Sequence, residues 1–165
     1  MKYLLLISAL FIFLSTTAQN PEKRLEELGI ELPEFSKPSA NYVKWRRVGN
    51  LLFLAGDGSE AKGTLGKDLT VEEGYEAARQ TGIDIISTLK AACGDLTKIK
   101  QFVKVHGMVS STPDFYDQPK VINGFSDLMV EVFGEKGKHA RAAVGMVSLP
   151  SNIAVEIEVI VEIED

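Results

Sequence analysis

The sequence predicts an α+β fold in which a mixed β-sheet carries two helices on one face. The first observation is the order of the periodic segments, β-β-α-β-α-β-β, which two packed layers account for. The second is the alternation from Val155 to Ile163, where branched apolar residues alternate mainly with glutamates, as in a strand with one buried face. The third is composition: 165 residues with 45% apolar and 25% charged side chains suit one globular domain.

Residues 1–18 are typical of a secretory signal peptide. Lys2 precedes an apolar run from Leu4 to Leu14, and small residues follow as far as Ala18. The run is short for a membrane-spanning helix, and a membrane anchor is the alternative interpretation. We therefore expect cleavage after Ala18, export to the periplasm or the extracellular space, and no membrane attachment of the mature chain.

Residues 19–40 are expected to form an N-terminal arm that lies on a domain of residues 41–165. A short charged segment from Pro21 to Leu28 predicts a brief helix. Pro33 and Pro38 punctuate the rest of the arm, and proline interrupts regular structure.

The domain is predicted to open with a β-hairpin. One strand runs from Tyr42 to Val48, the next from Leu51 to Ala55, and Gly49-Asn50 forms the turn. A polar, glycine-rich loop is expected from Gly56 to Asp68. Its start superficially resembles a phosphate-binding loop, but no helix begins immediately after it, so a nucleotide site is not predicted.

The first long helix is expected between Thr70 and Gly94. Thr70 and Glu73 have the spacing of a capping box, and Gly94 is a typical stop. Cys93, near the end, is the single cysteine of the chain, so it cannot form an internal disulfide and is interpreted as a packing residue. The predicted buried stripe is Ala77, Ala78, Thr81, Ile85, Thr88, Leu89 and Ala92.

A strand from Ile99 to Val109 and a second helix from Asp117 to Phe133 follow, separated by a turn at Thr112–Asp114. In the strand, Val103, Val105 and Gly107 are expected on one face and Phe102, Lys104 and His106 on the other. The buried face of the helix is expected to contain Val121, Phe125, Leu128, Met129 and Val132.

Two C-terminal strands complete the sheet, joined by a Pro150-Ser151-Asn152 turn. In the last strand the residues expected to face the helices are Val155, Ile157, Val159, Val161 and Ile163, and those on the other face are Glu156, Glu158, Ile160, Glu162 and Glu164. The uncovered face still carries apolar groups such as Ile160, so we expect it to pack on another subunit.

Arg141 and Glu156 are the residues with the clearest chemical potential. A guanidinium can hold a small carboxylate through two parallel hydrogen bonds, and a glutamate can hold or deprotonate a water beside it. The structural alternatives are a surface cation for Arg141 and a solvated row of glutamates for Glu156. His106 and His139 are interpreted as structural or exposed rather than catalytic. The sequence has no metal-ligand cluster and no phosphate loop, so no metal and no cofactor are expected. The net charge of −5 argues against nucleic-acid binding.

These residues resemble the RidA (YjgF/Rid, reactive-intermediate deaminase) family, whose fold is also called chorismate mutase-like. The resemblance covers roughly Ser39 to Glu162, and its most specific parts are Ala140–Val144, Leu149-Pro150 and Val155–Glu158. It implies a homotrimer with active sites between neighbouring subunits. It also implies hydrolysis of 2-imino acids or enamines to 2-oxo acids and ammonia.

The resemblance assigns roles residue by residue. Arg141 matches the arginine that binds the substrate carboxylate, Glu156 the acidic residue that positions the water, and Tyr42 a tyrosine of the cleft. Asn123 matches a helix asparagine that lines the site, and Ala55 and Gly56 stand in a substrate-contacting motif. We therefore expect Arg141, Glu156 and Tyr42 to be catalytic, and Arg141, Asn123, Ala55 and Gly56 to bind substrate.

The chain departs from the family pattern at two places. Ala55-Gly56-Asp57 stands where Ser-Gly-Gln is common, and Ala143 stands where cysteine is common. A substrate-contacting hydroxyl is lost, and a carboxylate replaces an amide. Three functions therefore stay open: an imine or enamine hydrolase, a non-catalytic trimer that binds small carboxylates, and a ribonuclease, an activity that some relatives carry.

Overall fold

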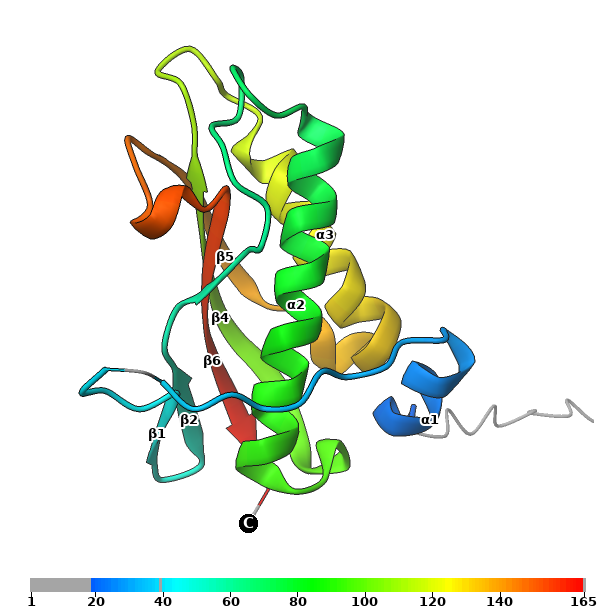
Figure 1. The fold of residues 1–165 in the computed structure, drawn as a ribbon. Helices are drawn as coiled ribbons and strands as arrows, with labels where there is room; N and C mark the ends of the chain where they lie inside the picture. Colours follow the sequence, from blue (N-terminus) through cyan, green and yellow to red (C-terminus); the bar gives the residue numbers. More distant parts are fainter. Residues whose placement is uncertain (1–18, 39, 165) are drawn as a thin grey trace, which may run out of the picture.

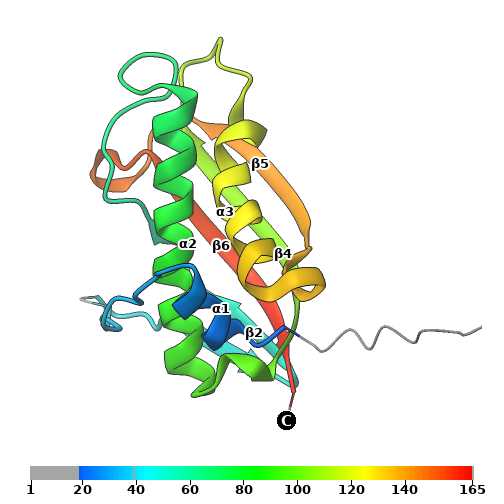
Figure 2. The ribbon, with the colours of Figure 1, turned by 90° about the vertical axis from the view of Figure 1, so that its right-hand side faces the viewer.

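A single mixed sheet forms one layer of the molecule, and two long helices cover one of its faces (Figures 1 and 2). This arrangement comes from a computed structural model that describes residues 19–38 and 40–164. The helices of this layer are α2 (Val71–Cys93) and α3 (Gln118–Phe133). The predicted α+β class and the predicted layering are confirmed, whereas the signal peptide predicted at residues 1–18 lies outside the described residues.

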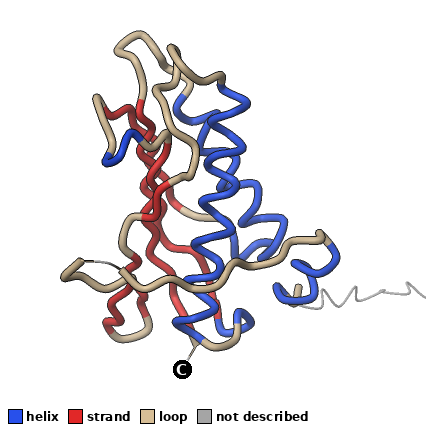
Figure 3. Tube along the Cα trace, in the orientation of Figure 1, coloured by secondary structure: helices blue, strands red, loops and turns tan. Residues whose placement is uncertain are grey.

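The sheet has six strands in the order β1-β2-β6-β4-β5, with β3 pairing β6 beside this path. Figure 3 shows the strands as one layer beside the helices. The strands are β1 (Trp45–Val48), β2 (Leu51–Leu54), β3 (Asp57–Gly58), β4 (Ile99–Ser110), β5 (Ala140–Met146) and β6 (Val155–Ile163). The remaining elements are α1 (Pro21–Glu27) and 3₁₀ turns at Leu96–Lys98, Gly134–Gly137 and Pro150–Asn152.

The predicted hairpin is present, but its strands are shorter than expected. β1 begins at Trp45, so Tyr42 precedes the strand, and β2 ends at Leu54. The loop after β2 contains an additional short strand, because Asp57 pairs with Ile157 and Gly58 pairs with Glu156. This strand fixes the start of the loop against β6.

The two C-terminal strands are joined in sequence but lie on either side of β4. β5 is parallel to β4, with Arg141 opposite Val105, and β6 is antiparallel to it, with Val159 opposite the same residue. In the connection, Ser151 and Asn152 have φ values of 54° and 58°, a left-handed pair that turns the chain sharply. The strands that carry Arg141 and Glu156 are therefore not neighbours.

The predicted alternation of β4 is wrong at Phe102 and Val103. Phe102 and Val105 are both buried although they are three residues apart, and Val103 is 37% exposed. The cause is a register shift between Phe102 and Lys104, which inserts an extra residue on β4 relative to β6. The alternation predicted for β6 is confirmed, because the five residues expected to face the helices are buried.

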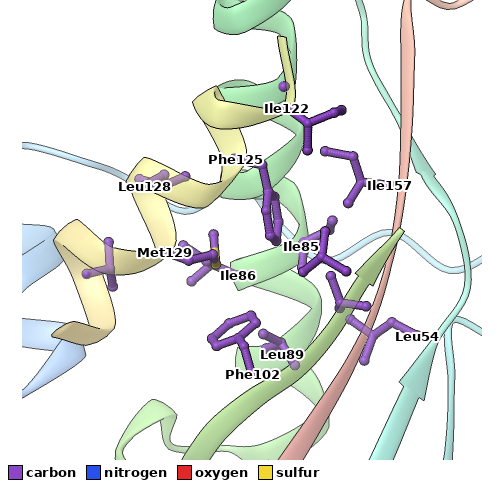
Figure 4. Close-up of a cluster of buried hydrophobic side chains, with 14 of the residues drawn as sticks. Leu54, Ile85, Ile86, Leu89, Phe102, Ile122, Phe125, Leu128, Met129 and Ile157 are labelled. Carbon is purple, nitrogen blue, oxygen red and sulfur yellow. The ribbon is translucent and has the colours of Figure 1, made fainter. Parts of the chain in front are cut away.

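Both ends of α2 form as predicted. Thr70 and Glu73 form a reciprocal capping box, and Gly94 closes the helix in the left-handed conformation at φ 74°. The predicted stripes of α2 and α3 are buried between helices and sheet, except that Ala92 is half-buried. Figure 4 shows this core, with Phe102, Phe125 and Ile85 between the two layers.

The N-terminal arm lies on the helical layer. The Glu22 carboxylate pairs with Lys90 and accepts a hydrogen bond from the Leu96 amide at 3.2 Å. Further along the arm, the Ser87 hydroxyl of α2 donates to the Pro33 carbonyl at 2.7 Å. Within residues 19–38 and 40–164, every helix is too short or too polar to cross a bilayer.

Candidate active site

Arg141 is held against one face of α3. Its Nη1 donates to Asn123 Oδ1 and to Ser126 Oγ, both at 2.9 Å, and its Nη2 lies 3.4 Å from the Pro119 carbonyl oxygen. Residues 119, 123 and 126 are spaced i, i+4, i+7 and so share one side of the helix. The structure thus brings together Arg141 and Asn123, two of the residues expected to bind substrate, and adds Ser126 and Pro119.

The contacts leave one edge of the guanidinium free. Arginine has five N–H donors, and the contacts to α3 occupy both donors of Nη1 and one of Nη2. Within the described chain, Nε and the second Nη2 donor form no hydrogen bond. This edge has the geometry that receives a carboxylate through two parallel hydrogen bonds.

Ser126 connects Arg141 to His139. The Ser126 hydroxyl lies 3.0 Å from His139 Nε2, and His139 Nδ1 lies 2.7 Å from the Gly137 carbonyl oxygen. Burial lowers the pKa of His139, the positive charge of Arg141 lowers it further, and the contact with Gly137 opposes both. Ser126 could not be identified as a site residue from local patterns, because a lone serine in a helix fits many roles.

Glu156 lies on the opposite side of the sheet, where its carboxylate packs on Gly56. A Cβ added to Gly56 would be 2.2 Å from Glu156 Oε1, so this contact requires glycine. Burial raises the pKa of Glu156, and the negative charges of Glu158 and Asp57 raise it further. Glu156 and the predicted substrate-binding residue Gly56 are therefore adjacent.

Asp57, the carboxylate that replaces the usual amide, is directed away from Glu156. It pairs with Ile157, whose side chain is buried under the helices, and its Oδ1 lies 3.1 Å from Lys44 Nζ. Burial and the charge of Asp57 raise the pKa of Asp84 on α2. The extra charge is thus balanced by Lys44 on the helical side of the sheet. These groups line a pocket of about 160 Å³ beneath Pro33–Ser36.

In the part of the chain that the structure describes, Ala55 and Tyr42 form no side-chain hydrogen bond with Arg141 or Glu156. Ala55 follows β2 directly, and its amide donates to the Lys44 carbonyl at 2.9 Å. Tyr42 is 53% exposed and lines a shallow pocket with Phe35, Pro38 and Trp45. Within the described chain its hydroxyl forms no hydrogen bond, and neither Arg141 nor Glu156 lines this pocket.

The candidate residues therefore form two separate groups, defined here as the arginine half-site (Arg141, Asn123, Ser126) and the glutamate half-site (Glu156, Gly56). Arg141 is in register with Val105 and Val159, whose side chains face the helices. Glu156 is in register with Met108 on the opposite face. A single chain thus holds the two half-sites on opposite faces of the sheet.

The described residues contain no group of three or more His, Cys, Asp or Glu side chains arranged to hold a metal ion. The two histidines, which are common metal ligands, lie in different surroundings. His139 contacts Ser126, whereas His106 Nδ1 lies 3.7 Å from Glu158 on the open face.

The fold and the two half-sites define a protein of the chorismate mutase-like class. Residues 22–163 match the family described as "YjgF/chorismate mutase-like, putative endoribonuclease", and the chain therefore belongs to this family. This result confirms the family that the sequence resembles.

Several relatives share most of the chain. Protein TCP17 of Trypanosoma cruzi is 43% identical, covering 86% of this chain and 92% of that protein. The crystal structure of Atu1372 from Agrobacterium tumefaciens, a protein of unknown function, has 45% identity and a TM-score of 0.81, covering 87% of this chain and 93% of that one. A protein of Shewanella oneidensis described as a putative endoribonuclease has 35% identity and a TM-score of 0.84, with 87% and 99% covered.

Proposed function

We propose that the protein is a homotrimeric hydrolase that converts 2-imino acids or enamines to 2-oxo acids and ammonia. In this proposal each active site combines the arginine half-site of one subunit with the glutamate half-site of its neighbour. The observation that carries it is the separation of the two half-sites on opposite faces of one sheet. Two groups that face away from each other in one chain can meet only across a subunit boundary.

Arg141 binds the substrate carboxylate. Asn123 and Ser126 hold Nη1, so the edge formed by Nε and Nη2 is directed and ready for a two-point contact. This contact fixes the plane of the carboxylate and with it the position of the adjacent imine carbon. Orientation of this kind lowers the entropic part of the barrier.

Glu156 activates the water. A protonated imine carbon is already electrophilic, so the reaction needs a positioned water and a proton acceptor rather than a covalent intermediate. Water adds to the carbon while Glu156 accepts a proton, which gives a carbinolamine. Glu156 then returns the proton to the nitrogen and ammonia leaves. As the 2-oxo acid forms, Glu156 accepts the hydroxyl proton and passes it to solvent. A raised pKa makes the Glu156 carboxylate a stronger base for this step.

The open face of the sheet supports the trimer. It carries exposed apolar side chains on three different strands, among them Phe53 at 39% and Val103 and Val144 at 37% each. A face of this kind, next to the acidic residues of β6, suits contact with a second copy of the chain. Light scattering on the purified protein should give three times the chain mass, and a monomer would contradict the trimer.

Export is a further part of the proposal. It is supported by the order of Lys2, the apolar run and the small residues up to Ala18. An exported enzyme meets imines formed outside the cytoplasm, so its substrate need not be that of cytoplasmic relatives. Sequencing the N-terminus of the mature protein should give Gln19 as its first residue, and an intact Met1 would refute export by this route.

The direct test is ammonia release from freshly generated 2-imino acids. The wild-type protein should accelerate it, and Arg141→Ala should lose the acceleration while keeping its unfolding temperature. A wild-type protein that accelerates no imine would overturn the hydrolase. If that protein still binds 2-oxo acids, the second candidate applies, a non-catalytic carboxylate binder, which the missing hydroxyl at Ala55 favours.

Ribonuclease activity is the third candidate, favoured by the family description. The acidic residues Glu156, Glu158 and Glu162 along β6 oppose it, because they repel a phosphate backbone. RNA cleavage that disappears in Arg141→Ala would favour this candidate over the hydrolase.

A further inference from the structure

A chain of hydrogen bonds runs from the Gly137 carbonyl through His139 and Ser126 to Arg141. The distances are 2.7 Å from Gly137 O to His139 Nδ1, 3.0 Å from His139 Nε2 to Ser126 Oγ, and 2.9 Å from Ser126 Oγ to Arg141 Nη1. A carbonyl only accepts, so Nδ1 of His139 carries the proton. Nε2 of the neutral ring then accepts from the Ser126 hydroxyl, and the Ser126 oxygen accepts from Arg141.

We propose that Ser126 and His139 are positioning residues that set the orientation of the Arg141 guanidinium. His139, neutral and protonated on Nδ1, turns the Ser126 hydroxyl so that its oxygen faces Arg141. The guanidinium is then fixed on one side, and its free edge is presented to the substrate carboxylate. This inference rests on the proposed function, because it concerns the same carboxylate-binding group.

The surroundings of His139 keep the ring neutral. The ring is half-buried and lies against Phe125 of α3 and Phe102 of β4, with centroids 5.8 Å and 6.5 Å away. Among the described residues that act electrostatically on the ring, Arg141 of β5 is the charged one, and it disfavours a second positive charge. α3 contributes the uncharged Ser126 at the same point.

Protonation of His139 would alter the hydrogen-bond chain at Ser126. Nε2 would become a donor, so the Ser126 hydroxyl could no longer donate to it, and two positive groups would share one oxygen. Arg141 would keep its bond to Asn123 but lose its fixed angle. The affinity for a carboxylate should therefore fall when His139 becomes charged.

Four variants test this chain of hydrogen bonds. Ser126→Ala removes the link, Ser126→Thr restores a hydroxyl, His139→Phe removes the acceptor but keeps a ring, and His139→Gln keeps an acceptor that cannot become charged. Tyr75→Phe is the matched control, because it deletes the 3.1 Å bond from Tyr75 to Asp127, the neighbour of Ser126, without touching the chain. Thermal unfolding establishes that each variant is folded.

The first measurement is pyruvate binding by calorimetry, with pyruvate as the 2-oxo acid probe. Ser126→Ala and His139→Phe should bind pyruvate about tenfold more weakly, the size expected for losing one hydrogen bond to a charged group. Ser126→Thr, His139→Gln and Tyr75→Phe should stay within about threefold of the wild type. In turnover, Ser126→Ala and His139→Phe should change KM more than kcat. Unchanged pyruvate binding in a folded Ser126→Ala protein would overturn the inference.

The second measurement follows pyruvate binding as the pH is lowered below the usual histidine range. The wild type should lose affinity with a break at the depressed pKa of His139, and His139→Gln should lack this break. If His139 had only a structural role, His139→Gln would lower stability but would leave the break in pyruvate affinity at the same pH as in the wild type.

The third measurement does not depend on the proposed function. The ¹⁵N shifts of the His139 ring should identify the tautomer with the proton on Nδ1, and Ser126→Ala should change the shift of Nε2. If the wild type bound no 2-oxo acid, the proposed function would fail, and these shifts would decide the hydrogen-bond chain alone. A ring protonated on Nε2 at neutral pH would overturn it.

Discussion

Arg141 and Glu156 lie on opposite faces of one β-sheet, with β4 between their strands. The register puts Arg141 on the helical face, at the level of Val105 and Val159, and Glu156 on the open face, at the level of Met108. The chemistry proposed for this family member requires both groups at one ligand. Under the proposed function, a single chain therefore supplies two complementary halves of a site rather than a complete one.

Arg141→Lys should lose carboxylate binding almost as completely as Arg141→Ala. Lysine keeps the charge but cannot bind Asn123 and Ser126 while presenting two parallel donors to a ligand. We expect kcat/KM to fall at least about 100-fold, the cost of a lost bidentate charged contact. Steady-state kinetics measures this change, and a lysine variant within a few-fold of the wild type would show that charge alone suffices.

Gly56→Ala should reduce activity more than stability. The added Cβ would meet the end of the Glu156 side chain at 2.2 Å, and this flexible end can move away at small cost to the fold. Its carboxylate would then leave the position in which it holds the water. We expect a loss in kcat of about 100-fold, the size expected when a catalytic group is misplaced by about 1 Å.

Gly94→Ala is the matched glycine control for this experiment. Gly94 has a φ of 74° and no neighbour within 4 Å of an added Cβ, so the change strains only the end of α2. We expect about 1 kcal/mol lower free energy of unfolding, with unchanged kcat. Equal effects of the two variants on kcat would argue against a specific role for Gly56.

The acid limb of the pH–rate profile should report Glu156. Its pKa is raised, so the carboxylate becomes protonated, and inactive as a base, at a higher pH than an ordinary glutamate. The profile of kcat should therefore fall on the acid side above the usual glutamate pKa. In Glu156→Gln this limb should be absent from the residual activity, and an unaltered limb would assign it to another group.

Stability should also fall on the acid side of neutrality because of His139. Its folded pKa lies below the unfolded value of 6.5, so the unfolded chain binds the proton more readily. The stabilising contribution is complete above the unfolded pKa and decreases as the pH falls from there toward the folded pKa. Chemical denaturation across this window should show the decrease in the wild type and a smaller one in His139→Gln.

Lys44→Met should destabilise the protein through Asp57. The two side chains are 14% and 18% exposed, so without Lys44 the Asp57 carboxylate is largely shielded from water and faces Asp84. We expect a loss of about 2 kcal/mol in the free energy of unfolding, partly recovered in Lys44→Met/Asp57→Asn. If the double variant were less stable than the single one, the charge on Asp57 would not be the cause.

Most of the fold follows from local patterns in the sequence. The capping box at Thr70 and Glu73, the stop at Gly94 and the alternation of β6 all concern residues close together in the chain, and all are confirmed. The bulge that exposes Val103 and the short strand at Asp57 depend on pairing with β6, about 50 to 100 residues away. Periodicity carries no information about such distant registers.

The candidate site also contains residues that the sequence indicated and residues that only the tertiary structure reveals. The resemblance indicated Arg141, Asn123, Gly56 and Glu156, and the structure brings them together in two pairs. It could not indicate Ser126 or His139, because their roles arise where α3 meets the start of β5. The direction of Asp57 toward Lys44 also depends on tertiary packing, since the two are paired across the hairpin and the following loop.

Subunit mixing tests the central claim most directly. Arg141→Ala and Glu156→Gln chains should each be inactive alone but should complement each other in mixed trimers, where one chain supplies the glutamate and its neighbour the arginine. With random 1:1 assembly, about a quarter of the sites should be complete and active. No recovery of activity from verified mixed trimers would mean that the two residues act within one chain or not at all, and would contradict the shared site.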